Sequence, residues 1–296
     1  MKAAIHILKA TSLAKTALKQ LAPDCVFSTG GYSSAPVVSA AKSLGIPYVI
    51  HEQNTVPGRT NRMLSNGAFA IATTFKNGSE HFGKTRTVRT GLPIRSELRQ
   101  FPQGKLSFTK PLPTDRPIVL VMGGSQGAQA LNEIALATAM RMIGQKVYWL
   151  VIAGIRNYDG LLSSMSKFNV EADFDIRSFL DAEEMAQALF VSKLVVCRSG
   201  GSLAELAAFR KPSVLIPLPS AMGNHQMINA QEFEAMGAAE VIPQADLTPS
   251  SLEARIRLWL SDEGVYKTAQ EKLADWDIPD TNERILSLLD EAKNSR

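Results

Sequence analysis

Short apolar stretches, each followed by a glycine-containing turn and then by residues with helical spacing, constrain this chain more than any other feature. The clearest is Ile118–Met122, which is apolar throughout, as strands buried on both faces of a parallel sheet are. The turn Gly123–Gly127 and a predicted helix to about residue 143 follow it. Because strand, turn and helix recur in this order, the sequence predicts an α/β fold of parallel sheets with helices on both faces.

This pattern runs through the chain in two series. The first series predicts strands at about 25–28, 46–50, 69–73 and 86–90. The second predicts strands at about 118–122, 147–153, 173–177, 194–197, 213–217 and 239–242. Helices are expected over about 2–21, 34–44, 58–66, 182–190, 248–260, 263–273 and 280–293. Three more are expected, from the turn at 123–127 to about 143, from the turn at 198–201 through 209, and from about 225 to 236.

The best linker candidate is the proline-containing stretch 100–116, which separates the two series. We therefore expect a first Rossmann-like domain over residues 1–115 and a second over 116–275. We expect residues 276–296 to form a helix that packs back on the first domain.

The two predicted halves differ in charge. Residues 1–115 contain 15 Lys/Arg and 5 Asp/Glu, whereas residues 116–296 contain 17 and 23. The basic half favours anionic partners such as phosphates or an acidic membrane surface. Nucleic acid is not expected, because the chain has no Cys/His finger, RNP-like strand or dense basic run. Two cysteines are too few for a disulfide framework, and no apolar run reaches the length of a transmembrane helix.

The turn Gly123-Gly124-Ser125-Gln126-Gly127 follows the strongest predicted strand and opens a helix. Glycines let backbone N–H groups approach an anion closely, and the start of a helix carries partial positive charge. Ser125 can add a hydroxyl donor. The turn therefore predicts either a phosphate site or a tight strand–helix connection that needs glycine only for its geometry.

A second such turn, Arg198-Ser199-Gly200-Gly201, leads to Glu205 about one helical turn later. A carboxylate in this place can accept hydrogen bonds from a ribose diol, or it can simply stabilise the helix dipole. Two turns of this kind, both at the carboxyl ends of parallel strands, favour a nucleotide-binding crevice.

The run His51-Glu52-Gln53-Asn54 follows an apolar strand in the first half. We expect these four polar residues to lie outside the core, at the ligand edge of the sheet. His51 and Glu52 are weak candidates for proton transfer or for binding a sugar hydroxyl, with loop capping as the alternative. The histidines form no metal-ligand spacing, so we expect no metal site. A Ser-His-Asp triad is not supported either.

Taken together, these motifs resemble the MurG family of glycosyltransferases. The resemblance is carried by Thr29-Gly-Gly-Tyr32, Ile50-His-Glu-Gln-Asn54, Gly123-Gly-Ser-Gln-Gly-Ala128 and Cys197-Arg-Ser-Gly200 with Ala204-Glu205-Leu206, in the family's order. It runs from about residue 10 to the C-terminus. It implies a GT-B fold, in which two Rossmann-like domains face each other across a cleft. It also implies transfer of N-acetylglucosamine (GlcNAc) from UDP-GlcNAc to undecaprenyl-diphosphate-MurNAc-pentapeptide (lipid I) in peptidoglycan synthesis.

The resemblance also implies roles for individual residues. Ser125 and the turn glycines Gly123, Gly124 and Gly127 would contact the diphosphate, and Glu205 would bind the ribose. Leu180 would lie beside the uracil. The remaining implied donor-binding residues are Ser202, Leu203, Ala204 and Gln226, with Asn54 and Arg95 reaching the donor from the first domain. The acceptor would lie on the first domain and react in one inverting displacement, which needs no metal or cofactor.

The family is peripheral to the cytoplasmic face of the bacterial inner membrane, and the basic first domain agrees with contact to anionic lipid. The alternative for the first, lysine-containing helix is an ordinary solvated face. Oligomeric state is left open by the sequence.

This sequence departs from the family pattern in three places. Roughly 70–80 residues of the family's N-terminal region are not found in it, including a His-bearing glycine loop, so no catalytic base can be assigned. Between Gly200 and Glu205 it is one residue shorter, and the loop Ser220–His225 lacks the family's usual acidic or doubled-Gln signature, of which only Gln226 remains. We expect the first Rossmann-like domain to be truncated, through an internal start at Met1 or a degenerate gene. Two other functions stay open: an inactive UDP-GlcNAc-binding fragment, and another GT-B enzyme such as a UDP-GlcNAc 2-epimerase.

Overall fold

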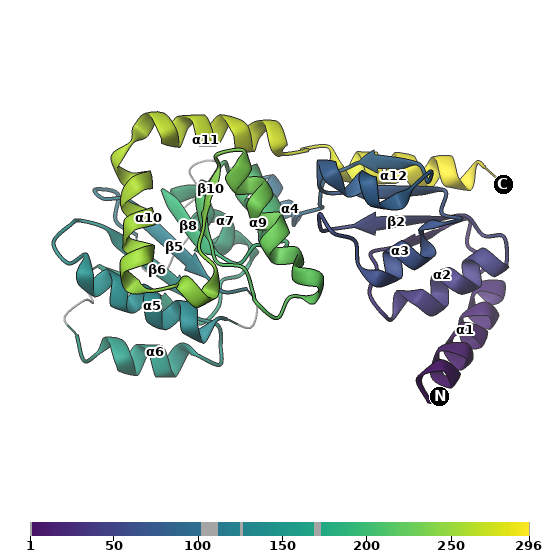
Figure 1. Cartoon of the computed structure of the whole chain (residues 1–296), viewed down its shortest axis with the longest axis horizontal. Coiled ribbons are helices and arrows are strands. Elements are labelled where there is room, and N and C mark those ends of the chain that lie inside the picture. Colours follow the sequence, from purple (N-terminus) through teal and green to yellow (C-terminus); the bar gives the residue numbers. More distant parts are fainter. Residues whose placement is uncertain (1, 102–111, 125–126, 169–172, 296) are drawn as a thin grey trace. The chain divides into compact units, whose positions relative to one another are not determined.

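The computed structural model describes residues 2–101, 112–124, 127–168 and 173–295. Contacts between residues divide the chain into two units (Figure 1). Unit 1 comprises Met1–Pro93 and Ile278–Arg296, and unit 2 comprises Ile94–Asp277. The boundary therefore falls before the proline-containing stretch that the sequence favoured as a linker. Residues 102–111, most of that stretch, lie outside the described residues.

Unit 1 is built on a four-stranded parallel sheet with strand order β1-β2-β3-β4. Its strands are β1 (Val26–Ser28), β2 (Tyr48–Glu52), β3 (Ala70–Thr73) and β4 (Thr87–Arg89). Its helices are α1 (Lys2–Leu21), α2 (Ser34–Ser43), α3 (Arg59–Ser65), the 3-10 helix η1 (Lys76–Phe82) and α12 (Thr281–Lys293). The strands are paired in register, with Val49 opposite Ala70 and Ile71 opposite Thr87.

The two faces of this sheet are covered by residues from the two ends of the chain. Leu288 and Ala292 of α12 pack on Val49 and Ala70, and Figure 1 shows α12 beside β2. Val38 packs with Tyr48, Ile50 and Leu64 in a separate cluster. The last helix is therefore part of the core of unit 1.

Helix α1 packs on α2 by one stripe only. Leu18 is buried with Ala40, Ala41 and Ile46. Several large apolar side chains of α1 are exposed instead: Ile7 (56%), Leu8 (70%), Leu13 (73%) and Leu21 (75%). Because charged residues on this helix are all basic, it presents an apolar and cationic surface.

Unit 2 is built on a six-stranded parallel sheet with strand order β10-β9-β8-β5-β6-β7. Its strands are β5 (Ile118–Met122), β6 (Tyr148–Ile152), β7 (Phe174–Arg177), β8 (Leu194–Cys197), β9 (Ser213–Leu215) and β10 (Ala239–Val241). Its α-helices are α4 (Ser96–Arg99), α5 (Gln129–Arg141), α6 (Tyr158–Met165), α7 (Ala182–Val191), α8 (Ser202–Ala208), α9 (His225–Ala235), α10 (Pro249–Ser261) and α11 (Glu263–Trp276). Two 3-10 helices, η2 (Met222–Asn224) and η3 (Gln244–Asp246), lie in its loops.

Strand β5 lies inside this sheet, between β8 and β6, and all five of its residues are buried. The order reverses direction there: β6 and β7 continue on one side, and β8, β9 and β10 on the other. In sheets of this kind ligands bind at the carboxyl ends of the strands beside such a switch point.

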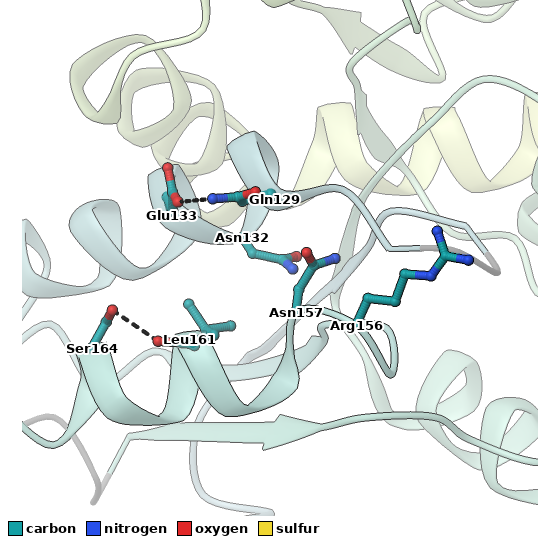
Figure 2. Close-up of a pocket in the computed structure, with 8 residues that line it drawn as sticks. Gln129, Asn132, Glu133, Arg156, Asn157, Leu161 and Ser164 are labelled. Carbon is teal, nitrogen blue, oxygen red and sulfur yellow. Dashed lines mark hydrogen bonds between the residues drawn. The ribbon is translucent and has the colours of Figure 1, made fainter.

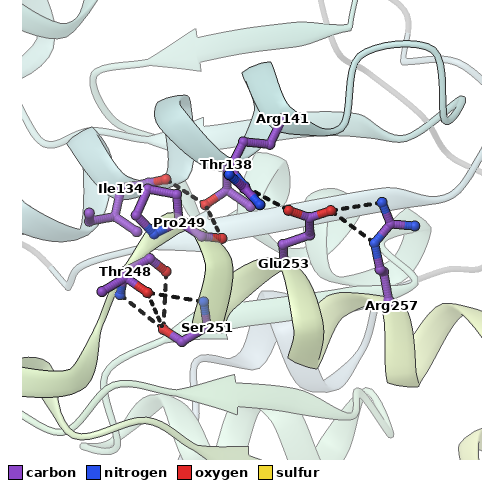
Figure 3. A network of polar contacts seen from close by, with 8 residues as sticks. All are labelled: Ile134, Thr138, Arg141, Thr248, Pro249, Ser251, Glu253 and Arg257. Carbon is purple, nitrogen blue, oxygen red and sulfur yellow. Dashed lines mark hydrogen bonds and ion pairs between the residues drawn. The ribbon is translucent and has the colours of Figure 1, made fainter.

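Helix α10 fixes the position of α5, which follows the turn at the end of β5. Figure 3 shows Thr138 of α5 contacting Pro249 of α10, where its hydroxyl donates to the backbone oxygen at 3.4 Å. Glu253 accepts hydrogen bonds from Arg141 on α5 and from Arg257 one turn along α10. These two guanidinium groups lower the pKa of Glu253 through their hydrogen bonds. A capping box of Thr248 and Ser251 begins α10.

The predicted α/β class is confirmed, with two parallel sheets and every predicted strand present. The short helices α4 and α6 were not predicted. Strand β2 extends through His51 and Glu52, which the sequence placed outside the core.

Candidate functional site

A cavity of about 300 Å³ opens at the carboxyl edge of the sheet of unit 2. It is lined by the ends of β5, β6 and β7, by the start of α8 and by one residue ahead of α4. Its lining residues are Arg95, Met122, Gly124, Ile152, Gly154, Ser178, Phe179, Leu180, Met185, Ser202 and Glu205. We call this space the donor cavity. Five residues predicted from the sequence, far apart in the chain, therefore line one space: Arg95, Gly124, Leu180, Ser202 and Glu205.

The glycine turn after β5 has a conformation that requires its glycines. Gly124 and Gly127 have φ angles of +87° and +72°, in the left-handed region that L side chains avoid. A Cβ on Gly123 would lie 2.4 Å from the backbone nitrogen of Ala128. Within the described residues, no side chain caps the N-terminus of α5, and the N–H groups of a helix start favour an anion. Ser125, the predicted hydroxyl donor of this turn, lies outside the described residues.

Glu205 and Arg95 form the charged part of the donor cavity. Nη2 of Arg95 lies 3.7 Å from Oε1 of Glu205, and the two side chains are 45% and 20% exposed. Burial raises the pKa of Glu205 above its ordinary value, and nearby Arg95 partly opposes this shift. Arg95 belongs to unit 2, whereas the sequence analysis had assigned it to the first domain.

The other predicted residues of the first turn of α8 differ in what they can contact. Ser202 lines the donor cavity. The side chains of Leu203 and Ala204 are buried at 1% and 3% exposure, in the core. They can therefore meet a ligand only through their backbone. Leu180 is also buried at 2% exposure, while its neighbour Phe179 is 60% exposed.

Gln226 lies beside the second glycine turn and is not among the lining residues of the donor cavity. Its Oε1 accepts a hydrogen bond from the N–H of Leu218 at 2.9 Å, and its backbone oxygen accepts one from the hydroxyl of Ser199 at 2.7 Å. The amide Nε2 would lie 3.8 Å from a Cβ on Gly200. The structure therefore brings Gln226 to the turn that precedes Glu205.

His51 and Glu52 are buried, contrary to the expectation that a polar run cannot belong to the core. They are 1% and 2% exposed. Nε2 of His51 donates to the carbonyl of Gly91 at 2.8 Å, and burial lowers the pKa of the imidazole. Glu52 accepts hydrogen bonds from the N–H groups of Asn54 and Gly58, and from Nδ2 of Asn61 at 2.7 Å. Satisfied hydrogen bonds, rather than exposure, explain how these polar groups are tolerated. Both side chains are buried and hydrogen-bonded within unit 1, which argues against a role in proton transfer.

Asn54 lies in unit 1, near the start of the loop between β2 and α3, whose backbone binds Glu52. Its side chain is partly exposed, and its Nδ2 lies 3.4 Å from Oε1 of Glu52. The carboxylate therefore fixes the conformation of the residue predicted to contact the donor.

A second cavity, of about 330 Å³, lies between α5 and α6 in unit 2 (Figure 2). Its lining residues are Gln129, Asn132, Glu133, Arg156, Asn157, Gly160, Leu161 and Ser164. Figure 2 shows the side chains of Asn132 and Asn157 directed toward each other. No feature of the sequence analysis identified this cavity.

Six lining residues of the donor cavity were missed by the sequence analysis: Met122, Ile152, Gly154, Ser178, Phe179 and Met185. Gly154 follows β6 with a φ of +82°, which makes it a third glycine at a strand end, and it lines the donor cavity. Its position directly after an apolar strand was the available signal. Phe179, an exposed aromatic residue on the lining, had no such signal. Within the described residues, no three His, Cys, Asp or Glu side chains lie together as a metal site.

Comparison with known proteins agrees with this geometry. The model of the glycosyltransferase family 28 C-terminal domain matches residues 118–285, and that of the N-terminal domain matches residues 1–73. A relative from Leuconostoc citreum is 36% identical over 284 residues, covering 95% of this chain and 77% of the relative. One from Bacillus licheniformis is 34% identical over 295 residues, covering 99% and 80%. Both are named UDP-N-acetylglucosamine--N-acetylmuramyl-(pentapeptide) pyrophosphoryl-undecaprenol N-acetylglucosamine transferase.

Solved structures show the same fold. The crystal structure of MurG from Acinetobacter baumannii superposes with a TM-score of 0.79 at 29% identity, covering 97% of this chain and 80% of that one. A putative UDP-N-acetylglucosamine 2-epimerase from Listeria monocytogenes has a TM-score of 0.75 at 14% identity, covering 98% and 80%. The second likeness, at so low an identity, concerns the fold alone.

Two parallel-sheet units, with a cavity at the carboxyl edge of the second sheet, define the GT-B class of glycosyltransferases. Both halves of the chain match one family within that class. The chain belongs to glycosyltransferase family 28 and, within it, to the MurG family.

Proposed function

We propose that this chain transfers GlcNAc from UDP-GlcNAc to the C4 hydroxyl of MurNAc in lipid I, with inversion at the anomeric carbon. The observation that carries the proposal is the donor cavity, where Arg95, Gly124, Leu180, Ser202 and Glu205 meet. These residues supply a cation, a glycine turn, an apolar wall and a carboxylate. That set suits a nucleoside diphosphate sugar.

On the donor side, each part of UDP has a matching group. The backbone N–H groups at the start of α5 suit the diphosphate, because a helix N-terminus favours negative charge. Glu205 would accept hydrogen bonds from the ribose hydroxyls, and Phe179 and Leu180 would contact the uracil. Gln226, beside the second glycine turn, would bind the sugar through its Nε2, since its Oε1 is already occupied.

The reaction is a single displacement. The C4 hydroxyl of the acceptor attacks the anomeric carbon, the bond to the β-phosphate oxygen breaks, and UDP leaves with the bonding electrons. The hydroxyl proton is released to solvent water in the same step. Arg95 and the start of α5 would stabilise the negative charge that develops on the leaving diphosphate. Neither His51 nor Glu52 takes the hydroxyl proton in this proposal, because each is buried with its own structural partners.

The acceptor and the membrane are assigned to unit 1. Its helix α1 exposes Ile7, Leu8, Leu13 and Leu21 and carries lysines without any acidic residue. Apolar side chains with surrounding cations suit an anionic lipid surface, and each basic residue near such a surface adds about 1 kcal/mol. None of the helices in the described part of the chain is long and apolar enough to cross a bilayer. We therefore propose peripheral binding to the cytoplasmic face of the membrane, where lipid I would be presented.

A transfer assay tests this proposal. Radiolabelled UDP-GlcNAc and a lipid I analogue with a shortened isoprenoid chain are incubated with the protein, and the lipid product is extracted and counted. The proposal expects a labelled disaccharide lipid and stoichiometric UDP. Binding of UDP-GlcNAc without product would instead support an inactive donor-binding protein. Formation of the 2-epimer of the free sugar nucleotide, without acceptor, would support an epimerase.

A vesicle assay tests the membrane part separately. We expect the protein to sediment with vesicles containing phosphatidylglycerol and not with phosphatidylcholine vesicles. Replacing Leu8 and Leu13 with Ser should reduce the bound fraction. Equal binding to both vesicle types, or no effect of the two substitutions, would contradict the role of α1.

A further inference from the structure

Two asparagines in unit 2 donate hydrogen bonds to the same backbone oxygen. Nδ2 of Asn132, on the first turn of α5, lies 2.9 Å from the carbonyl oxygen of Ala153. Nδ2 of Asn157, the residue before α6, lies 3.2 Å from the same oxygen. Ala153 directly follows β6, so one carbonyl joins two helices to the end of a central strand.

The glycine turn packs against this oxygen as well. A Cβ on Gly127 would lie 2.1 Å from the Ala153 oxygen and 2.6 Å from Nδ2 of Asn157, distances that no side chain could tolerate. Its N–H donates to the carbonyl of Gly124 at 2.9 Å. The position of the turn is therefore set by where the Ala153 carbonyl and the asparagine side chains lie.

The buried amide of Asn132 is unfavourable for folding, because one of its polar atoms lacks a partner in the described part of the chain. The residue is 1% exposed, and its Oδ1 has no hydrogen-bond partner in the part of the chain that the structure describes. A buried acceptor without a partner is unfavourable, and a leucine would fill the same space without one. The hydrogen bond of Nδ2 to Ala153 is what the asparagine adds.

The contacts around this oxygen are not held by packing alone. Asn132 and Asn157 both line the second cavity, Asn132 as a buried residue and Asn157 as a partly exposed one (Figure 2). On the other side, Gly124 of the turn and Gly154, directly after Ala153, line the donor cavity. The two amides thus stand between an open space and the turn proposed to bind the diphosphate.

We infer that Asn132 and Asn157 are positioning residues, which hold Gly124 and Gly127 where their backbone can bind the diphosphate of the donor. This inference rests on the proposed function. It assigns the two asparagines to the diphosphate only, because Glu205 and Leu180, proposed for the nucleoside, lie on other elements of the cavity. Losing one charge-assisted hydrogen bond to a phosphate oxygen through misplacement of the turn would weaken binding by about tenfold or more.

Binding of UDP and of uridine separates positioning from general damage. We expect Asn157→Ala and Asn132→Leu to weaken the binding of UDP by about tenfold or more, with the affinity for uridine changed less than about twofold. UDP is measured by calorimetric titration and uridine by competition against a fluorescent UDP analogue. Asn157 is partly exposed and makes no side-chain cap to α6, so its variant should fold even if the buried Asn132→Leu does not.

The matched control is Ser164→Ala, on the wall of the same cavity. The hydroxyl of Ser164 donates only within α6, to the carbonyl of Gly160 at 2.9 Å. This variant should bind UDP and uridine like the parent protein.

The possible outcomes distinguish the two proposals. If the parent protein binds UDP and the Asn157 variant binds it equally well, or loses UDP and uridine by the same factor, the positioning role is refuted and the donor site stands. If the parent protein binds neither ligand, both proposals are refuted, because the asparagines then have no diphosphate to serve.

Discussion

Replacing Glu205 by Gln perturbs one predicted contact with little other change. The substitution keeps the shape of the side chain and removes its charge. Glu205 forms an ion pair with Arg95 at 3.7 Å, and the Arg95 side chain is 45% exposed. Such a pair contributes less than about 1 kcal/mol to folding, so the variant should stay folded.

The effect on binding should be larger. A hydrogen bond from a ribose hydroxyl contributes about 1.5–3 kcal/mol to a carboxylate and about 0.5–1.5 kcal/mol to a neutral acceptor such as the Gln amide oxygen, so the substitution should cost about 1–1.5 kcal/mol, or roughly a 5- to 10-fold change in the dissociation constant. Because UDP and uridine share the ribose, both ligands should be weakened by the same factor. Calorimetric titration of UDP, and competition by uridine, measure this directly.

The pH dependence gives a second test of the same contact. Burial raises the pKa of Glu205 above the ordinary 4.5. A group with a raised pKa gains its proton at a higher pH, so the carboxylate that binds ribose is lost as the pH falls through that raised value. As the pH is lowered, the affinity of the parent protein for uridine should therefore begin to decrease before pH 4.5 is reached. The affinity of Glu205→Gln should not change over the same range.

Two results would refute this reasoning. If Glu205→Gln binds uridine as tightly as the parent protein at neutral pH, Glu205 does not bind the ribose. If the variant and the parent show the same fall in affinity with acid, another group is responsible. Uridine is preferred over UDP here because it has no phosphate that titrates in this range.

Three further predictions concern stability and reactivity. Lys211 is 9% exposed, and burial lowers its pKa to about 8. Because the unfolded chain binds this proton more tightly than the folded protein, the free energy of unfolding should rise by about 2–3 kcal/mol as the pH increases from 7 to 10. The free energy of unfolding of Lys211→Met, measured with urea, should not show this rise. A rise equal to that of the parent protein would contradict the role of Lys211. Thr248→Ala removes the cap of α10 and should cost about 1 kcal/mol in the same assay. Burial raises the pKa of Cys197 to about 12, so a thiol reagent should label Cys25 in the folded protein and Cys197 only after unfolding; labelling of both at once would refute this.

The elements of the fold were predictable because they depend on local patterns. Buried parallel strands such as β5 are apolar throughout, and a glycine turn follows, so both the strand and the turn can be recognised from neighbouring residues. Helix α6 was not predicted because it has only eight residues, and its N-terminus has no side-chain cap hydrogen bond. Strand order cannot be read from such patterns, since it depends on contacts between distant segments.

The candidate site was predictable in its parts and not in its assembly. Glu205 and Gly124 were chosen for their place after strands, and the structure brings them to one cavity. The error at His51 and Glu52 has a physical origin. A polar side chain can be buried when backbone groups satisfy it, and the partners Gly91, Gly58 and Asn61 lie up to 40 residues away in the sequence.

The two asparagines illustrate the same limit. Nothing in the sequence near Asn132 or Asn157 indicates that both reach the carbonyl of Ala153. The contact depends on how α5 and α6 approach the end of β6, which only the folded chain defines. Positioning residues of this kind can therefore be identified from a structure but not from the sequence alone.

Diffraction from crystals soaked with UDP tests the central claim most directly. The account predicts difference density in the donor cavity, with the ribose within hydrogen-bond distance of Glu205 and the diphosphate against Gly124 and the start of α5. Clear density for UDP at any other place on the protein, with this cavity empty, would contradict it.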